Sequence, residues 1–205
     1  MVKYNFQKLN MNNNENILTK STLRNIINKT YFDINSAYIS NEDDLSEYDI
    51  QYLLFVSLKE QLKNKGCKIK KEKNKVDISI ENEKKTFNYW FEIKSFIKTH
   101  EYINIDGINN DISNLESLFI EKSSSEKRAF MVIAAREKTL QRTKTKNKEL
   151  SDYLDHKTKS SPLKLKRGFK QQLISSYTIS HNNSLDRKNI GHQVRLFLIE
   201  ISKTN

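Results

Sequence analysis

The sequence predicts an α/β fold, a three-layer sandwich built around a central mixed β-sheet with helical additions. Two periodicities predict it. Apolar residues recur every three or four positions in residues 46–66 and 107–122, as on one face of a helix. They alternate instead in residues 76–80 and 86–96, as in half-buried strands. The run AFMVIAA at 129–135 suits a strand covered on both faces. The order is therefore helix, three strands, helix, strand.

The first helix has recognisable ends. Ser46 is the expected N-cap, with Asp49 three residues later, and Gly66 is the expected C-terminal stop. Its expected apolar face consists of Tyr48, Tyr52, Phe55, Leu58 and Leu62. The face expected for the second helix consists of Ile108, Ile112, Leu115, Leu118 and Phe119.

The remaining elements follow from shorter signals. Residues 67–71 are a further strand candidate, and residues 194–201 (VRLFLIEI) suit a final strand. Leu150, Tyr153 and Leu154 give a short helical cue, and residues 163–179 suit either a helix or a strand. Residues 1–45 are rich in Asn and predict an N-terminal arm or a small helical elaboration. Residues 46–205 then form the main domain, with a basic insertion at about 136–170.

Charge points to an anionic partner. The 205 residues carry a formal net charge of +11, and residues 121–172 hold 15 Lys or Arg against 6 Asp or Glu. Such a surface favours nucleic acid through phosphate contacts, although a solvated charged segment is the alternative. The candidate nucleic-acid contacts are Arg136, Lys138, Arg142, Lys144, Lys146, Lys148, Lys164, Lys166, Arg167 and Lys170.

Composition also bounds the compartment and the cofactors. Cys67 is the single cysteine, so no internal disulfide forms and a cytoplasmic location is expected. We see no signal peptide and no apolar run long enough to span a bilayer, so no membrane partner is expected. The four glycines form no phosphate loop, so no nucleotide cofactor is expected.

The stretch VDISIENEKKTFNYWFEIKSF predicts a hairpin with one apolar and one polar side. A turn at Lys84 and Lys85 places Ile80 opposite Tyr89, Ile78 opposite Phe91 and Val76 opposite Ile93. On the other side Ser79 lies opposite Trp90, Asp77 opposite Glu92, and Lys75 opposite Lys94. Directly opposite Cβ atoms are about 4.5–5.5 Å apart. Two carboxylates at that distance repel each other unless a proton or a cation lies between them.

A hard divalent cation satisfies this arrangement. Mg²⁺ binds one or two carboxylates and keeps several waters, which leaves room for a phosphate oxygen. Lys94, two residues after Glu92, points to the same side and can activate a water or stabilise charge on a phosphate. The alternative is a surface hairpin whose Asp, Glu and Lys residues form ordinary cross-strand ion pairs.

Asp77, Glu92 and Lys94 form a D…ExK pattern after a helix, and this resembles the PD-(D/E)xK nuclease superfamily typified by type II restriction endonucleases. The resemblance covers residues 46–135 and implies a restriction-endonuclease-like fold. It implies that Asp77, Glu92 and the Ile93 carbonyl bind Mg²⁺, for which Mn²⁺ can substitute, and that Lys94 is catalytic. Glu47 matches an outer ligand on the preceding helix, with Asp49 and Glu60 as alternatives. Val76 departs from the family's proline.

By this resemblance the chain is a Mg²⁺-dependent endonuclease acting on double-stranded DNA, most simply a homodimeric restriction enzyme. The preference for DNA over RNA comes from the resemblance alone. Two other interpretations remain open: a non-catalytic nucleic-acid-binding protein, and a recombination, junction-resolving or mobile-element nuclease. A weaker candidate is a histidine-based metal site at His181 and His192, which lack companion cysteines.

Overall fold

A computed structural model describes residues 17–40, 45–73, 76–84, 86–97, 102–121, 124, 126–177 and 194–204. The helices are α1 (Lys20–Ser40), α2 (Glu47–Gln61), α3 (Ile105–Glu121), α4 (Glu137–Lys146) and α5 (Lys148–Leu154). The strands are β1 (Cys67–Lys73), β2 (Val76–Asn82), β3 (Phe87–Phe96), β4 (Glu126–Arg136), β5 (Phe169–Tyr177) and β6 (Val194–Lys203). Among these residues, none of the helices has the length and apolar character needed to cross a membrane.

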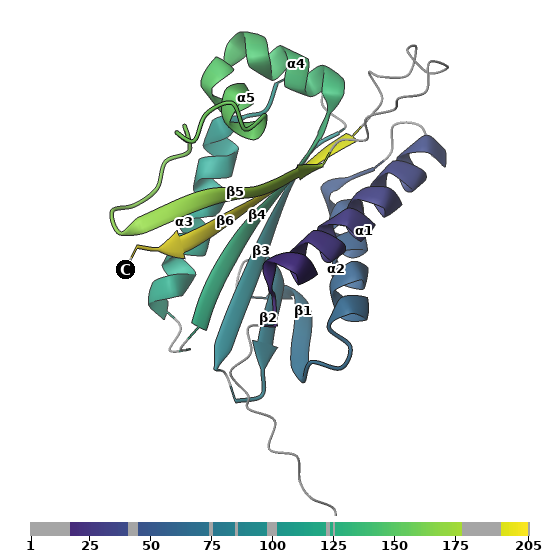
Figure 1. The fold of residues 1–205 in the computed structure, drawn as a ribbon, viewed down its shortest axis with the longest axis vertical. Helices are drawn as coiled ribbons and strands as arrows, with labels where there is room; N and C mark the ends of the chain where they lie inside the picture. The colour runs from purple at the N-terminus through teal and green to yellow at the C-terminus, as the bar shows by residue number, and fades with distance from the viewer. Residues whose placement is uncertain are drawn as a thin grey trace, which may run out of the picture.

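The predicted α/β sandwich is confirmed. The six strands form one mixed sheet in the order β1-β2-β3-β4-β6-β5, in which only β3 and β4 run parallel. A parallel pair needs a crossover connection, and α3 lies in it. Helices α1 and α2 cover one face of the sheet, and α3, α4 and α5 pack on the other (Figure 1). Two separate apolar cores therefore flank the sheet.

The N-terminal region contributes a layer of this sandwich. Leu23, Ile26, Ile27 and Ile34 of α1 are fully buried in the core shared with α2 and the sheet. The expected helical elaboration at residues 1–45 thus includes a helix that covers the sheet.

The apolar face predicted for α2 is wrong at two positions. Its Ser46–Asp49 capping box is present, as expected. The buried residues, however, are Ile50, Gln51, Leu54, Ser57 and Leu58, whereas Tyr48 and Tyr52 are 60 % and 54 % exposed. The helix ends at Gln61, and Gly66 supplies the left-handed turn (φ +60°) that leads into β1.

The predicted hairpin register is confirmed where pairs are formed. Ser79 pairs with Trp90, and the neighbouring pairs follow the same register. Val76 is the exception, because it packs with Trp90 in the core beneath α3 and not on the side of Ile93. The pairing of β2 with β3 ends at Ile78, so it no longer determines the face on which Val76 lies. Lys75 lies outside the described residues.

The basic segment is more regular than its sequence indicates. Residues 137–146 are too polar to predict a helix, yet α4 forms there and buries Thr139, Leu140 and Thr143. The helical cue near Leu150 is confirmed by α5, and residues 169–177 form strand β5 and not a helix. His100, His181 and His192 lie outside the described residues.

An aromatic contact with the sheet helps to anchor helix α3. Phe119 packs edge-to-face on Trp90, with ring centroids 5.6 Å apart, and both side chains are buried. The next residue, Ile120, is 72 % exposed. All five residues predicted for the apolar face of this helix are buried.

We therefore predict that Phe119→Ala lowers the free energy of unfolding by about 3–5 kcal/mol, because it leaves a cavity against Trp90. Urea denaturation followed by the fluorescence of Trp90, the single tryptophan, measures this change. Ile120→Ala is the matched control and should change stability by less than about 0.5 kcal/mol. Equal effects of the two substitutions would contradict the described packing of α3.

Candidate active site

The three hairpin residues of the D…ExK pattern meet at the end of β3. Asp77 is half-buried at the start of β2, Glu92 is buried in β3, and Lys94 is half-buried two residues later. Asp77 and Glu92 lie close enough for each carboxyl group to shift the pKa of the other. Two carboxyl groups this close favour a proton or a cation between them.

Their surroundings hold that proton in place. Burial, followed by the neighbouring Asp77 carboxylate, raises the pKa of Glu92 to about 9. Burial also raises the pKa of Asp77, against the effect of the Ile93 backbone N–H, which donates to Asp77 Oδ2 at 2.7 Å. Like charges and burial both disfavour ionisation of the second acid. The pair thus carries one negative charge and one proton.

Helix α2 supports Asp77 through a residue that the sequence analysis did not identify. The side-chain amide of the buried Gln51 donates to the Asp77 carbonyl oxygen at 3.1 Å and to Asp77 Oδ1 at 3.2 Å. Together with the Ile93 N–H, it fixes both carboxylate oxygens. The available signal was its spacing, because Gln51 lies one turn after Glu47 and on the same side of α2.

Glu47 is also at this end of the sheet. Its Oε2 accepts a hydrogen bond from the Ser95 backbone N–H at 3.1 Å, and burial raises its pKa. The two alternatives are engaged elsewhere. Asp49 closes the capping box with Ser46, and Glu60 forms an ion pair with Lys29 at 3.5 Å. Of these three α2 acids, Glu47 is therefore the one that is hydrogen-bonded to the strand that carries Glu92 and Lys94.

Lys94 is held by helix α3. Its Nζ lies 2.9 Å from Asp111 Oδ2. Its Cε lies beside Gly107 of the same helix, 3.7 Å from where the Cβ of a larger residue would be. Burial alone would lower the pKa of Lys94, but the ion pair with Asp111 outweighs it and raises the pKa. Lys94 therefore stays a cation at neutral pH. Asp111 is the second site residue that sequence reasoning missed, since only the packing of α3 places it there.

The edge strand is distorted beside Asp77. Glu72 of β1 has a φ of +51°, and the pairing of β1 with β2 omits the position between Lys71–Ile78 and Lys73–Val76. Left-handed backbone is unfavourable for residues other than glycine and occurs often at functional sites. The omitted position lies opposite Asp77, whose carbonyl oxygen accepts a hydrogen bond from the Gln51 amide.

The basic residues divide into two groups. Lys138, Arg142, Lys144 and Lys146 of α4 are exposed, as is Lys148. Helix α4 lies at the same end of the sheet as Lys94, because Thr139 Oγ1 donates to the Phe96 carbonyl at 3.3 Å. Its position is reinforced by Arg195 of β6, whose guanidinium lies 3.0 Å from Asp155 and 3.8 Å from Glu137.

The second group comes from the segment that passes α3 and leads into β5. Lys164, Lys166, Arg167 and Lys170 are exposed, and the backbone of Lys166 donates to Glu116 on α3. Arg136 differs from expectation, since only 6 % of it is exposed and its side chain is not part of the outer basic surface.

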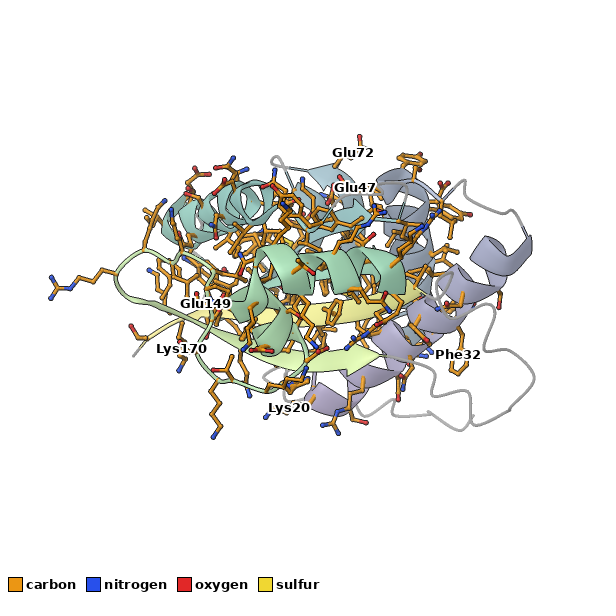
Figure 2. The ribbon with its side chains drawn as sticks, turned by 90° about the horizontal axis from the view of Figure 1, so that it is seen from above. Lys20, Phe32, Glu47, Glu72, Glu149 and Lys170 are labelled. Carbon is orange, nitrogen blue, oxygen red and sulfur yellow. The ribbon has the colours of Figure 1, made fainter. Side chains whose placement is uncertain are left out.

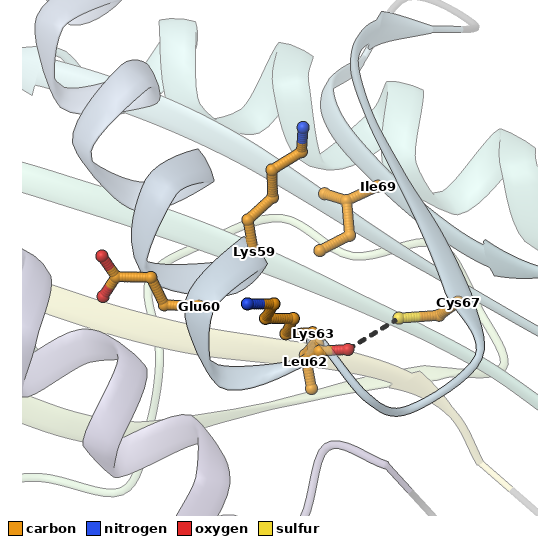
Figure 3. Close-up of a pocket in the computed structure, with 6 residues that line it drawn as sticks. All are labelled: Lys59, Glu60, Leu62, Lys63, Cys67 and Ile69. Atoms are coloured by element: carbon orange, nitrogen blue, oxygen red, sulfur yellow. Dashed lines mark hydrogen bonds between the residues drawn. The ribbon is translucent and has the colours of Figure 1, made fainter.

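The pocket drawn in Figure 3 lies at the opposite end of α2 from Glu47. It is lined by Lys59, Glu60, Leu62, Lys63, Cys67 and Ile69. Cys67 is half-buried there, and its thiol donates to the Leu62 carbonyl. The hairpin acids are not among the lining residues. This pocket is therefore separate from the candidate active site.

Comparisons with known proteins leave the site to be judged on its own geometry. Within the part of the chain that the structure describes, no group of three or more His, Cys, Asp or Glu side chains is assembled as a metal site. Searches against protein-family models, curated proteins and solved structures found no match for this chain.

Proposed function

We propose that the chain is a metal-dependent nuclease of the PD-(D/E)xK type that hydrolyses DNA phosphodiester bonds. The observation that carries the proposal is the position of Asp77 beside the Glu92–Lys94 segment, because the Ile93 N–H donates to Asp77 Oδ2 at 2.7 Å. Two partly buried acids this close to each other do not stabilise a fold, since each disfavours ionisation of the other. They do form a site for one positive charge.

The donor set suits Mg²⁺, with Mn²⁺ as a substitute. Asp77 and Glu92 would be the ligands, with the Ile93 carbonyl as a third oxygen and Glu47 as outer support. Two carboxylates are sufficient for Mg²⁺, which retains waters and binds phosphate oxygens. When bound, such an ion polarises a phosphoryl oxygen and lowers the pKa of water.

The protein's own residues then have distinct roles. Gln51 and the Ile93 N–H orient the Asp77 carboxylate. Lys94 remains protonated, so it stabilises negative charge developing on a phosphate rather than acting as the base. Asp111 positions the Lys94 ammonium from α3.

The fold agrees with this assignment at the level of its order of elements. Helix α2, strands β1 to β3, helix α3 and strand β4 follow the order expected for a restriction-endonuclease-like domain. Exposed cations on α4 supply a surface for duplex DNA beside the site. A homodimer would provide one active site for each strand of a symmetric sequence.

The first test is incubation of the purified protein with long duplex DNA, with and without Mg²⁺. We expect discrete fragments that require Mg²⁺. Asp77→Ala should abolish them, and Lys94→Ala should slow cleavage by about 10²–10³-fold while leaving DNA affinity unchanged. Lys65→Ala, an exposed lysine beyond the other end of α2, is the control.

Three other outcomes would redirect the proposal. Cleavage restricted to branched or nicked DNA would indicate a junction or repair nuclease. Bound but intact DNA, with Lys94→Ala indistinguishable from wild type, would indicate a non-catalytic binding protein. Cleavage that persists in Asp77→Ala would rule out this site.

The acid pair also predicts a pH dependence of stability. Between about 4.3, the pKa of an unfolded glutamate, and about 9, the folded protein keeps a proton on Glu92 that the unfolded chain has released. The free energy of unfolding of the metal-free protein should therefore fall as pH rises through this window, by at most about 1.4 kcal/mol per pH unit. Denaturation in EDTA at several pH values measures the slope.

Glu92→Gln should reduce that slope, and Mg²⁺ should restore stability at the alkaline end by replacing the proton. Glu121→Gln, on the exposed end of α3, is the control and should retain the full slope. A slope that is unchanged in Glu92→Gln would show that the proton is not held by this pair.

The basic stripe on α4 should contact the DNA backbone. Lys138, Arg142 and Lys146 are spaced four residues apart and share one helical face. Replacing all three with Ala should reduce the slope of log K against log[salt] by about 2–3, since each phosphate contact contributes about 0.9. Fluorescence anisotropy in EDTA measures this. The matched triple variant at Lys164, Lys166 and Arg167 distinguishes the two basic groups; a larger loss there would place the DNA along α3.

A further inference from the structure

An exposed aromatic pair lies on α2 beside the candidate active site. Tyr48 and Tyr52 are one turn apart and are 60 % and 54 % exposed. They directly follow Glu47 and Gln51, the two α2 residues that hydrogen-bond to Ser95 and Asp77. The same stretch of α2 therefore contacts the candidate site through Glu47 and Gln51 and exposes the two tyrosine rings to solvent on an adjacent side of the helix.

A lysine from the sheet edge completes this surface. The Lys71 ammonium lies 4.0 Å from the Tyr48 ring centroid and 5.7 Å from that of Tyr52. Lys71 pairs with Ile78, the residue that follows Asp77. Figure 2 shows Glu47 and Glu72, the neighbours of Tyr48 and Lys71, close together, whereas Phe32 lies on a distant part of the molecule. We call Tyr48, Tyr52 and Lys71 the aromatic platform.

Burial does not explain the platform. The residues of α2 that pack into the core are Ile50, Leu54 and Leu58, on a different side of the helix. Adjacent exposed aromatic side chains that form one surface are typical of an interaction site. Lys71 places a positive charge beside the two rings, so the platform suits a flat ring that carries a negative group at its margin.

We infer that the aromatic platform stacks an unpaired nucleobase next to the scissile phosphate, so that DNA with a single-stranded segment beside the cleavage site binds more tightly than a blunt duplex. The inference rests on the proposed nuclease function for its substrate class. Every base offers a flat face for stacking on an aromatic ring, and a lysine ammonium adds affinity for the flanking backbone. Bases inside a duplex are already stacked on both faces, so only an unpaired or terminal base can use the rings.

The test measures binding apart from cleavage. The full chain is titrated in EDTA with two DNAs that carry 2-aminopurine at one position, either within a blunt duplex or in a short single-stranded flap. We expect the flapped DNA to bind about tenfold more tightly, corresponding to one stacked base, with quenching of the 2-aminopurine fluorescence. The double variant Tyr48→Ala, Tyr52→Ala should bind both DNAs equally and leave the probe unquenched.

Two controls separate stacking from general damage. The double variant Tyr48→Phe, Tyr52→Phe keeps the rings and should keep the preference for the flap. Phe32→Ala removes another aromatic residue that is 60 % exposed, on α1, and should change nothing. Equal binding of both DNAs by the wild-type protein, or a preference that survives in the alanine variant, would overturn the inference. An effect of the alanine variant on self-association alone would assign the rings to a protein contact and overturn it too.

The outcome is distinguishable from failure of the nuclease proposal. If Mg²⁺ produces no cleavage but the flap preference still depends on Tyr48 and Tyr52, the platform stands and the catalytic assignment falls. If cleavage occurs but the wild-type protein and the double alanine variant each bind flapped and blunt DNA equally, the catalytic assignment stands and the platform falls.

Discussion

The proximity of the Asp77 and Glu92 carboxyl groups is the constraint around which this end of the molecule is organised. A folded chain tolerates two partly buried acids this close together only when a proton or a cation lies between them. The pairing of β2 with β3 extends to Ile78 and Phe91, the neighbours of these two acids, and its register is determined by the apolar residues on the opposite side of the hairpin. The packing of the core therefore enforces an electrostatic arrangement that is unfavourable by itself.

The supporting groups come from different layers. Helix α2 supplies the Gln51 amide to Asp77 and the Glu47 carboxylate to the backbone of Ser95. Helix α3 supplies Asp111 to Lys94 from the other side of the sheet. This helix lies at the site because the parallel pairing of β3 with β4 requires a crossover that begins where β3 ends. The candidate site is thus a junction of all three layers, and its geometry depends on both helices remaining docked.

Local patterns predicted the elements whose periodicity reports burial. The hairpin register and the buried face of α3 followed from alternating and helical spacing, and both were confirmed. Contacts between layers were beyond this reasoning, so Gln51 and Asp111 were missed although they lie on predicted helices. The helical spacing of Tyr48 and Tyr52 was wrongly assigned to the core, because periodicity shows which residues share a face and not what covers that face. Helix α4 was missed because its buried face consists of two threonines and one leucine.

Charge balance links the parts of the proposed site. Without a metal, the acid pair holds one proton, and the Lys94 cation is matched by Asp111. Replacing the shared proton with a divalent cation adds one unit of positive charge where a phosphate would lie. Binding of the cation and of the phosphate should then strengthen each other by the same factor, since coupling between two ligands is reciprocal. The metal-free protein would hold nucleic acid mainly through the exposed cations of α4, and the hairpin would attract phosphate only after the cation had bound.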